Sequence, residues 1–432
     1  MMPTLPDPKP GYIDTYYSRT LDGAAATYPV LTGTVQADVC VVGGGFAGLA
    51  TALGLIERGK SVVILEAHRI GYGASGRNGG FCLRDYARHV DSLIEKVGVE
   101  HAKALYAIVA DAQGLMRRRI ADYNIDCGPN TNGYLNVSWT PQVGKLHAYA
   151  DLMCKTVGQD IEVWPTEKIR DLYSTKNYHD ALFYPNDFQL HPLRYAQGIA
   201  RAIAAKSGQI FEASAAEALR RTGEGYEIKT SRGFVRAGDV VLCGSAYGGG
   251  LHPKVKYSML PVATYIMVTE PIPEETMRKA IRAPYEVMDM RYASNYYRQL
   301  PDGRLLWGGY VSLRDNPPGL QDKMLNDLEA IYPQLKGTKP AVTWSGLMGF
   351  ATHKMPLIHQ IEPGLWTCTA FGGHGVCATT AGGEVVASAI AEGDKRYELF
   401  KPFGFGFTAG PLGRVAAQGV YTWWRVRDVL GF

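Results

Sequence analysis

The residues best suited to bind a ligand are Gly43, Gly45 and Gly48, which form the pattern G-x-G-x-x-G after a short apolar run. The first glycine of this pattern permits a tight turn, the second lets a pyrophosphate approach the backbone, and the third lets a helix pack closely on a sheet. Glu66 follows about twenty residues later, where an acid accepts hydrogen bonds from a ribose. Because a strand is predicted before the glycines and a helix after them, the pattern predicts a dinucleotide site rather than an isolated turn.

A second glycine-rich stretch, residues 71–80, follows Glu66 and contains Ser75, Arg77 and Asn78. Arginine and serine can neutralise and hydrogen-bond a phosphate, and glycines leave backbone N–H groups unhindered beside a planar ligand. By itself the stretch also fits a flexible surface loop with an Asn-Gly turn. Its position directly after the dinucleotide pattern favours a second clamp on the same ligand.

A third glycine cluster, residues 372–375, contains His374 and separates a predicted buried strand from a predicted small-residue helix at 376–391. A helix beginning there would direct its positive end at negative charge that forms on the ligand. His374 could add to this stabilisation. The alternative is a histidine that only caps the turn through a local hydrogen bond.

The elements that must position these residues follow from the apolar pattern. Residues 38–42 and 61–65 are predicted strands on either side of a helix at 46–57, and residues 239–243 return the chain to the same sheet. Helical spacing dominates residues 85–124. Residues 257–345 read as antiparallel strands rich in aromatic side chains, with a helix at 320–332. These aromatics are either ordinary sheet packing or a wall over a bound ring system.

Composition excludes several classes of function. The net charge of +4 is small for 432 residues, and no long basic block is present, so we expect no nucleic-acid partner. The seven scattered cysteines lack metal-ligand spacing, which predicts reduced thiols, no metal and a cytoplasmic protein. No apolar run is long enough to span a membrane, and the N-terminus lacks a signal core. The C-terminal Trp-Trp-Arg segment predicts an amphipathic helix that docks on its own domain, on a second subunit or on a membrane surface.

Several of these segments together resemble the FAD-dependent D-amino-acid oxidase superfamily, which includes the glycine and sarcosine oxidases. They are the first strand–helix–strand unit with Glu66, IGYGASGRNGG, DMRYASNYYRQLPDGRLLWGG, ATHKMPLI and AFGGHGV, which occur in this order. Within the superfamily the chain is most similar to the gamma-glutamylputrescine oxidoreductase branch. The resemblance covers residues 13–400.

The resemblance implies an α/β composite, in which a Rossmann-like FAD-binding domain carries an inserted, mostly antiparallel substrate-binding domain. We expect the FAD-binding domain to comprise residues 37–84, 190–250 and 346–400, and the substrate-binding domain to comprise residues 85–189 and 251–345. An N-terminal arm (1–36) and a C-terminal tail or helix (401–432) complete the chain.

The resemblance also implies site residues. His374 and Tyr296 are expected to act in catalysis. The residues expected to contact the substrate are Tyr292, Tyr296, Arg298 and Trp344. The residues expected to bind FAD are Gly43, Gly45, Phe46, Ala47, Gly48, Glu66, Ala67, Ala74, Ser75, Arg77, Asn78, Gly79, Gly80, Gly244, Met355, Gly373, His374, Gly375 and Val376.

Two positions depart from the resemblance. A cysteine that bonds the flavin in sarcosine oxidases is matched here by Met355, so we expect non-covalent FAD. A lysine that aids oxygen reduction in those enzymes is matched by Leu306, which leaves the electron acceptor open.

The activity implied is oxidation of a C–N bond in a small amine or N-substituted amino acid, with a gamma-glutamylputrescine-like amine favoured. Hydride would pass to flavin N5, the imine would hydrolyse, and O2 would reoxidise the flavin to give H2O2. The alternatives are a dehydrogenase that uses another acceptor, an NAD-linked dehydrogenase, and a flavin-binding protein without turnover. A homo-oligomer is left open.

Overall fold

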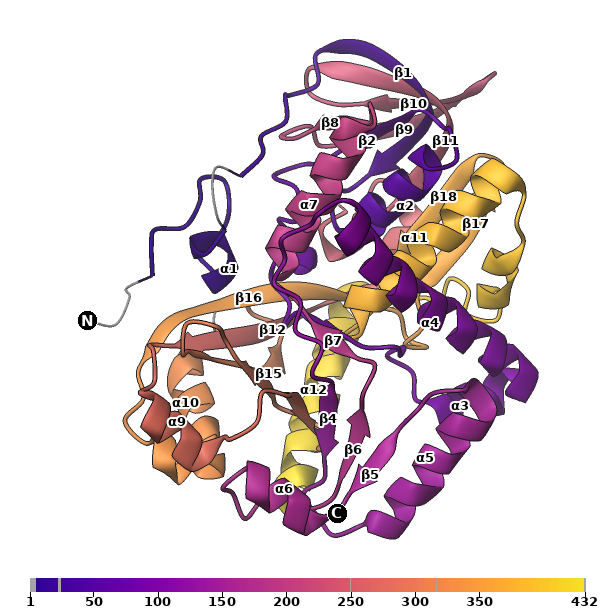
Figure 1. Cartoon of the computed structure of the whole chain (residues 1–432). Coiled ribbons are helices and arrows are strands. Elements are labelled where there is room, and N and C mark those ends of the chain that lie inside the picture. Colours follow the sequence, from indigo (N-terminus) through magenta and orange to yellow (C-terminus); the bar gives the residue numbers. More distant parts are fainter. Residues whose placement is uncertain (1–4, 22–24, 249, 316, 431–432) are drawn as a thin grey trace.

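The computed structural model of the chain describes residues 5–21, 25–248, 250–315 and 317–430. The chain folds around two large sheets, which occupy the upper and lower parts of Figure 1. A small ladder of β3 (Phe81–Cys82) and β7 (Phe188–Gln189) lies between them. The predicted α/β fold class is confirmed.

The first sheet is mainly parallel. Its central order is β17-β18-β11-β1-β2-β8, in which only β17 runs antiparallel to its neighbour, while β10 and β9 extend β11 as an antiparallel ladder. The strands are β1 (Gly33–Val42), β2 (Val62–Leu65), β8 (Gln209–Phe211), β9 (Ala218–Thr222), β10 (Gly225–Lys229), β11 (Gly233–Leu242), β17 (Leu357–Glu362) and β18 (Leu365–Thr369).

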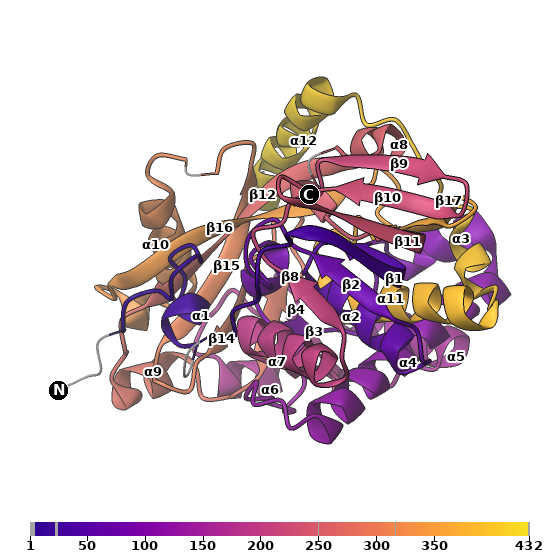
Figure 2. The ribbon, with the colours of Figure 1, turned by 90° about the horizontal axis from the view of Figure 1, so that it is seen from above.

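Helices cover one face of this sheet (Figures 1 and 2). They include α2 (Phe46–Ile56), α4 (Val99–Asp122), α7 (Pro192–Ala205) and α11 (Gly375–Glu392). Side chains alternate along β1: Val39 and Val41 pack with the helices, whereas Cys40 packs on the opposite face. Burial on both faces explains why the end of this strand, residues 39–42, is a continuous apolar run.

The second sheet is mostly antiparallel, with the order β16-β12-β15-β14-β13-β4-β6-β5 and one parallel pair, β13 with β4. Helices α6, α9 and α10 contribute to the core on one of its faces. The elements are β4 (Tyr134–Val137), β5 (Glu162–Trp164), α6 (Thr166–Leu172), β6 (Ala181–Tyr184), β12 (Leu260–Thr269), α9 (Glu274–Ala280), β13 (Glu286–Asp289), β14 (Tyr296–Gln299), β15 (Leu305–Ser312), α10 (Leu320–Ile331) and β16 (Pro340–Phe350).

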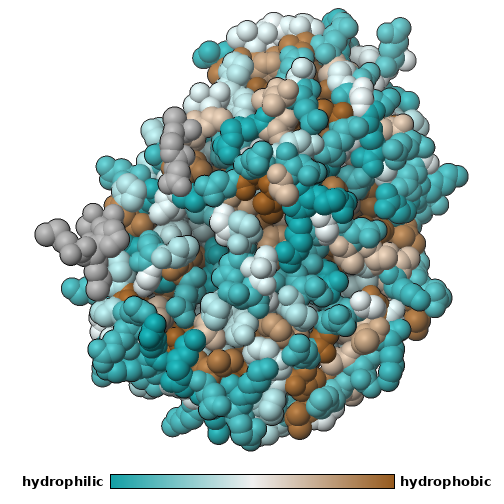
Figure 3. All heavy atoms as spheres, viewed as in Figure 1, coloured by the Kyte–Doolittle hydropathy of each residue, from teal (hydrophilic) through white to brown (hydrophobic). Residues whose placement is uncertain are grey.

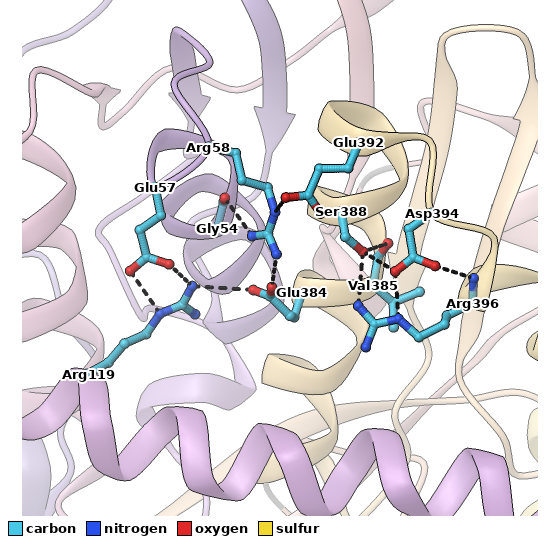
Figure 4. Close-up of polar contacts among 10 residues, drawn as sticks. All are labelled: Gly54, Glu57, Arg58, Arg119, Glu384, Val385, Ser388, Glu392, Asp394 and Arg396. Atoms are coloured by element: carbon cyan, nitrogen blue, oxygen red, sulfur yellow. Dashed lines mark hydrogen bonds and ion pairs between the residues drawn. The ribbon is translucent and has the colours of Figure 1, made fainter.

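A charged network fastens α2 to α4 and α11 (Figure 4). Arg119, which is 2% exposed on α4, donates a 2.6 Å hydrogen bond to Glu57 and lies 3.5 Å from Glu384 of α11. Arg58 bonds the same Glu384 and also Glu392. Because Arg119 of α4 and Arg58 at the end of α2 both meet Glu384, the network sets how α2 and α11 sit relative to each other.

The C-terminal segment forms one long helix, α12 (Gly410–Leu430), which contacts β12 and β15 of the second sheet. Figure 2 shows it beside β12, separate from the helical layer of the first sheet. The remaining helices are α1 (Tyr16–Arg19), α3 (Val90–Val97), α5 (Val143–Val157) and α8 (Pro253–Tyr257). None of the helices in the described ranges combines the length and apolar character needed to cross a membrane. The face drawn in Figure 3 is largely hydrophilic, with scattered apolar side chains.

Two features bear on the domain boundaries. β16 continues in the second sheet to Phe350, beyond residue 345, and α4 packs against α11 although it lies within residues 85–189. We therefore propose a division into an FAD-binding and a substrate-binding part with two changes to the predicted bounds. The boundary predicted after residue 345 moves to residue 350, and α4 is assigned to the FAD-binding part.

Candidate active site

A cavity of about 560 Å³ lies where the parallel strands of the first sheet end and the second sheet begins. Val42, Leu65 and Thr369 reach it from the carboxyl ends of β1, β2 and β18. In an open α/β sheet this edge is where ligands bind. Most predicted site residues line the cavity, namely Gly43, Gly45, Phe46, Ala47, Glu66, Ala67, Ala74, Ser75, Arg77, Asn78, Gly79, Gly244, Tyr292, Tyr296, Gly373, His374, Gly375 and Val376.

The first glycine turn has the geometry that its pattern predicts. Gly43 has φ +114°, a backbone conformation that strongly favours glycine. A Cβ on Gly48 would lie 1.9 Å from the carbonyl oxygen of Gly43. Gly48 does not line the cavity; its role is the close packing of α2 on the turn. The turn therefore leaves the N-terminus of α2 open to the cavity, as a phosphate requires.

Glu66 stands at the end of β2 with both carboxylate oxygens engaged. Oε2 accepts a 2.7 Å hydrogen bond from the backbone N–H of Gly44, and Oε1 accepts a 2.8 Å bond from that of His68. Burial raises the pKa of Glu66, and these backbone hydrogen bonds oppose the rise. The carboxylate is thereby oriented beside the cavity, where it can accept from a ribose.

The second glycine-rich stretch is held by its own side chains. Ser75 Oγ accepts a 2.8 Å hydrogen bond from the backbone N–H of Phe46, which joins the loop to the start of α2. Asn78 donates to Ala74 O at 3.0 Å and accepts from the N–H of Gly80 at 2.8 Å. These bonds describe an ordered clamp and do not fit the alternative of a free surface loop.

Arg77 is the cation of this clamp. Its Nε donates a 2.7 Å bond to Tyr72 O, and its guanidinium lies 4.6 Å from the centre of the Tyr72 ring. Trp344 supports the clamp from behind, because its Nε1 donates a 2.9 Å bond to Arg77 O. Arg77 is thus held in place at the cavity wall, where a phosphate can pair with it.

His374 occupies the N-cap position of α11, but its side chain makes no capping hydrogen bond. Its Nδ1 is shielded from solvent and has no hydrogen-bond partner among the described residues. Burial lowers the pKa of His374; Asp85 opposes this effect, whereas His89 and Lys354 add to it. The imidazole is therefore neutral at pH 7 and lines the cavity. The absence of a capping hydrogen bond argues against a purely capping role.

Tyr296 reaches the cavity from β14 because glycines leave room for its ring. A Cβ on Gly308 would lie 2.0 Å from the Tyr296 ring, and one on Gly79 would lie 2.9 Å from it. Phe81 meets the same ring edge-on at 5.5 Å. Burial raises the pKa of the Tyr296 hydroxyl, so it stays protonated at neutral pH. Tyr296 therefore offers the cavity an apolar ring.

Besides Gly48, four further predicted site residues do not line the cavity. Arg298 is 6% exposed and donates hydrogen bonds to Gln189 Oε1 at 2.8 Å and Leu190 O at 3.0 Å, so the β7 segment covers it. Trp344 is buried beneath the loop that carries Arg77. Gly80 packs against Leu190 O and the guanidinium of Arg298. Met355 is fully buried in the core of the first sheet. These residues lie outside the cavity lining, so their direct contact with a ligand stays a prediction.

The structure adds cavity residues that the sequence patterns did not indicate. Tyr421 and Trp424 come from α12, Lys354 comes from the turn after β16, and Met288 and Met348 come from the second sheet. The paired tryptophans of the C-terminal helix were the only signal, and they do not reveal which elements the helix contacts. Leu306 is fully buried and does not line the cavity. A lysine does line the cavity, but at position 354.

The cavity fits a dinucleotide cofactor on several observations together. It combines a glycine turn that a Cβ would block, a half-buried carboxylate at the ribose position, an ordered arginine clamp, and the N-termini of two helices, α2 and α11. FAD has the pyrophosphate, ribose and planar ring that these groups match.

Comparison with known proteins agrees with this geometry. Residues 38–389 match the family described as FAD dependent oxidoreductase. The chain is 32% identical over 426 residues to gamma-glutamylputrescine oxidoreductase of Escherichia coli (strain K12), covering 97% of this chain and 99% of that protein.

Solved structures show the same fold at low sequence identity. Glycine oxidase from Geobacillus kaustophilus has a TM-score of 0.73 at 19% identity, with 86% of this chain and 98% of that chain covered. L-proline dehydrogenase from P. horikoshii has a TM-score of 0.72 at 19% identity, with coverage of 86% and 96%. The family match, the full-length similarity and the cavity agree on FAD rather than NAD as the cofactor. The chain therefore belongs to the FAD dependent oxidoreductase family, as its glycine patterns and the segments shared with that superfamily predicted.

Proposed function

We propose that the protein oxidises the C–N bond of a small amine, with a gamma-glutamylputrescine-like amine as the favoured substrate. The observation that carries this proposal is the similarity to the Escherichia coli gamma-glutamylputrescine oxidoreductase, which extends over nearly the whole of both chains. Bound FAD supplies the two-electron acceptor for this oxidation. The residues of the chain position the amine and remove its proton.

The substrate chamber is the part of the cavity lined by the second sheet and α12. Its walls include Met288, Tyr296, Met348 and Trp424. Among the cavity-lining residues that the structure describes, the only carboxylate is that of Glu66, which belongs to the ribose end. A chamber without a partner for an ammonium ion favours the neutral amine, the form from which a C–N bond is oxidised.

His374 is the group that we assign to accept the proton of the bound ammonium. It lines the cavity, its Nδ1 has no partner among the described residues, and burial keeps its pKa below the ordinary value. A neutral imidazole can take one proton and later release it to solvent. The overall change converts R–CH2–NH2, O2 and H2O into R–CHO, NH3 and H2O2. With another acceptor, that acceptor takes the two electrons in place of O2.

We also propose that FAD is held without a covalent bond. The position matched with the flavin-bonding cysteine of sarcosine oxidases is Met355, whose side chain is fully buried in the core. Precipitation with acid should release yellow flavin into the supernatant. Flavin that stays with the pellet would contradict this proposal.

The function is tested by the visible spectrum of the purified protein under anaerobic conditions. Gamma-glutamylputrescine should bleach the flavin, and admission of air should restore the oxidised spectrum with formation of peroxide. Bleaching without recovery in air would indicate a dehydrogenase with another acceptor. A flavin that neither this amine nor putrescine, sarcosine or glycine reduces would refute the proposed activity.

A further inference from the structure

The cavity opens to solvent at the end remote from the nucleotide turn. Tyr292 is 53% exposed and Lys354 is exposed, yet both line the cavity. Tyr310, Tyr421 and Trp424 complete the cavity wall at this end. We call these five residues the mouth.

Helix α12 builds and holds the mouth. Asp428 Oδ1 accepts a 3.0 Å hydrogen bond from the backbone N–H of Tyr292, and Oδ2 accepts a 2.8 Å bond from that of Ala293. The ring of Trp424 lies 6.1 Å from that of Tyr292. The loop between β13 and β14 is thus fastened to the helix, and the two sides of the opening are fixed relative to each other.

The mouth and its rim carry positive charge. Lys354 Nζ lies 5.3 Å from the centre of the Trp424 ring, and the guanidinium of Arg425 lies 4.3 Å from the Tyr310 ring. Arg427 lies 4.4 Å from the Tyr292 ring. The carboxylate of Asp428 is already engaged by two backbone N–H groups. Among the described residues of the mouth itself, Lys354 is the only charged side chain.

The backbone at the mouth is also unusual. Lys354 has φ +60° and Tyr310 has φ +60°, in the left-handed region that non-glycine residues seldom adopt. Such conformations cost free energy and concentrate at ligand-binding positions. The turn at Lys354 therefore presents its ammonium to the cavity at an energetic cost, which is a reason to look for a ligand there.

We propose that the mouth recognises a carboxylate at the end of the amine substrate remote from the oxidised carbon, with Lys354 as the group that binds it. The inference rests on the proposed amine oxidation and narrows its substrate class to long amines with an anionic tail. Trp424 holds the Lys354 ammonium in place and excludes water from one side of the contact. The aromatic side chains of the mouth pack along the aliphatic part of the tail.

The test compares two amines that differ only in this carboxylate: gamma-glutamylputrescine and N-(4-aminobutanoyl)putrescine. In Lys354→Met the KM for the first should rise about tenfold, as expected for loss of a charge-assisted contact, with kcat unchanged. The KM for the second amine should change less than about twofold, because this amine has no carboxylate for Lys354 to bind. Lys354→Arg should restore most of the difference. Lys256→Met is the matched control, because this lysine also lies over an aromatic ring, that of Tyr257, but does not line the cavity.

Binding provides a readout that does not need turnover. Gamma-glutamyl-n-butylamide carries the same carboxylate but lacks the reactive amine, and its binding can be followed by the perturbation of the flavin spectrum. Wild type should bind it about tenfold more tightly than Lys354→Met. Equal binding by the two proteins, or equal effects of the substitution on both amines, would overturn the inference. Failure of the wild-type flavin to be reduced would refute the proposed oxidation independently, because this titration still reports the carboxylate site.

Discussion

Glu66 and Gly44 are joined by a 2.7 Å hydrogen bond from the backbone N–H of the glycine turn to the carboxylate at the end of β2. The bond couples the two parts of the dinucleotide site that the sequence separates by a helix. The Glu66 carboxylate also accepts a 2.8 Å hydrogen bond from the backbone N–H of His68. Removal of this carboxylate would therefore leave two backbone donors without their acceptor.

Substitution Glu66→Ala should therefore weaken FAD binding by roughly tenfold or more, since charged hydrogen bonds are lost. The dissociation constant can be measured by titrating apoprotein with FAD and following protein fluorescence. Glu227→Ala is the control, because that acid pairs with arginines on the surface ladder, remote from the cavity. Unchanged FAD affinity in Glu66→Ala would contradict the assigned role.

Gly48 should be intolerant of any side chain. A Cβ there would lie 1.9 Å from Gly43 O, so Gly48→Ala should destabilise the fold by roughly 3 kcal/mol or more. Gly114 provides the matched control, since it lies within α4 and a Cβ would approach only the end of Arg118 at 3.5 Å. Gly114→Ala should stabilise the helix by about 0.5–1 kcal/mol. Chemical denaturation of both variants measures the difference, and equal stabilities would contradict the close packing.

The proton-accepting role of His374 predicts a specific pH dependence. Because burial lowers its pKa, the imidazole stays neutral at pH 7 and becomes protonated only below the ordinary range of histidine. The rate of anaerobic flavin reduction should therefore fall on the acidic side, as the pH drops through this lowered pKa. His374→Gln should lower the rate roughly a hundredfold and abolish the acidic limb, with FAD content unchanged. An acidic limb that persists in the variant would belong to another group.

Arg119 lies at the buried end of the charged network and is expected to stabilise the fold. It is 2% exposed and bonds Glu57, so Arg119→Met should destabilise the protein by roughly 3 kcal/mol, because the acids lose their partner in a partly buried site. Arg220 also pairs with a glutamate, but it is 72% exposed, so Arg220→Met should cause no measurable loss. The midpoint of thermal unfolding reports both. Equal effects would mean that burial of the pair contributes little.

Much of the fold and of the nucleotide site could be predicted because the signals are local in the chain. The glycine turn, α2, β2 and Glu66 lie within one continuous segment, and their spacing is set by the length of one strand and one helix. The clamp around Arg77 follows immediately. Each glycine requirement arises from backbone geometry, which local sequence specifies directly.

The substrate end was less predictable, as Tyr296 and Arg298 show. Both lie on one face of β14, because side chains two apart point the same way. Tyr296 reaches the cavity because Gly308 and Gly79 make room for it, whereas Arg298 is covered by Gln189 and Leu190. Neither the glycine gap nor the covering segment is adjacent in sequence, so periodicity could not separate the two residues.

The sequence by itself determined the dinucleotide turn, the family and the FAD cofactor, since these depend on short segments whose residue types have local physical causes. Only the tertiary structure decided that α12 lines the open end of the cavity with Tyr421 and Trp424, and that Lys354 lies beside them. The physical reason is that this wall brings together the loop between β13 and β14, the turn after β16 and the C-terminal helix. Their meeting depends on packing between segments far apart in the chain, which no local pattern records.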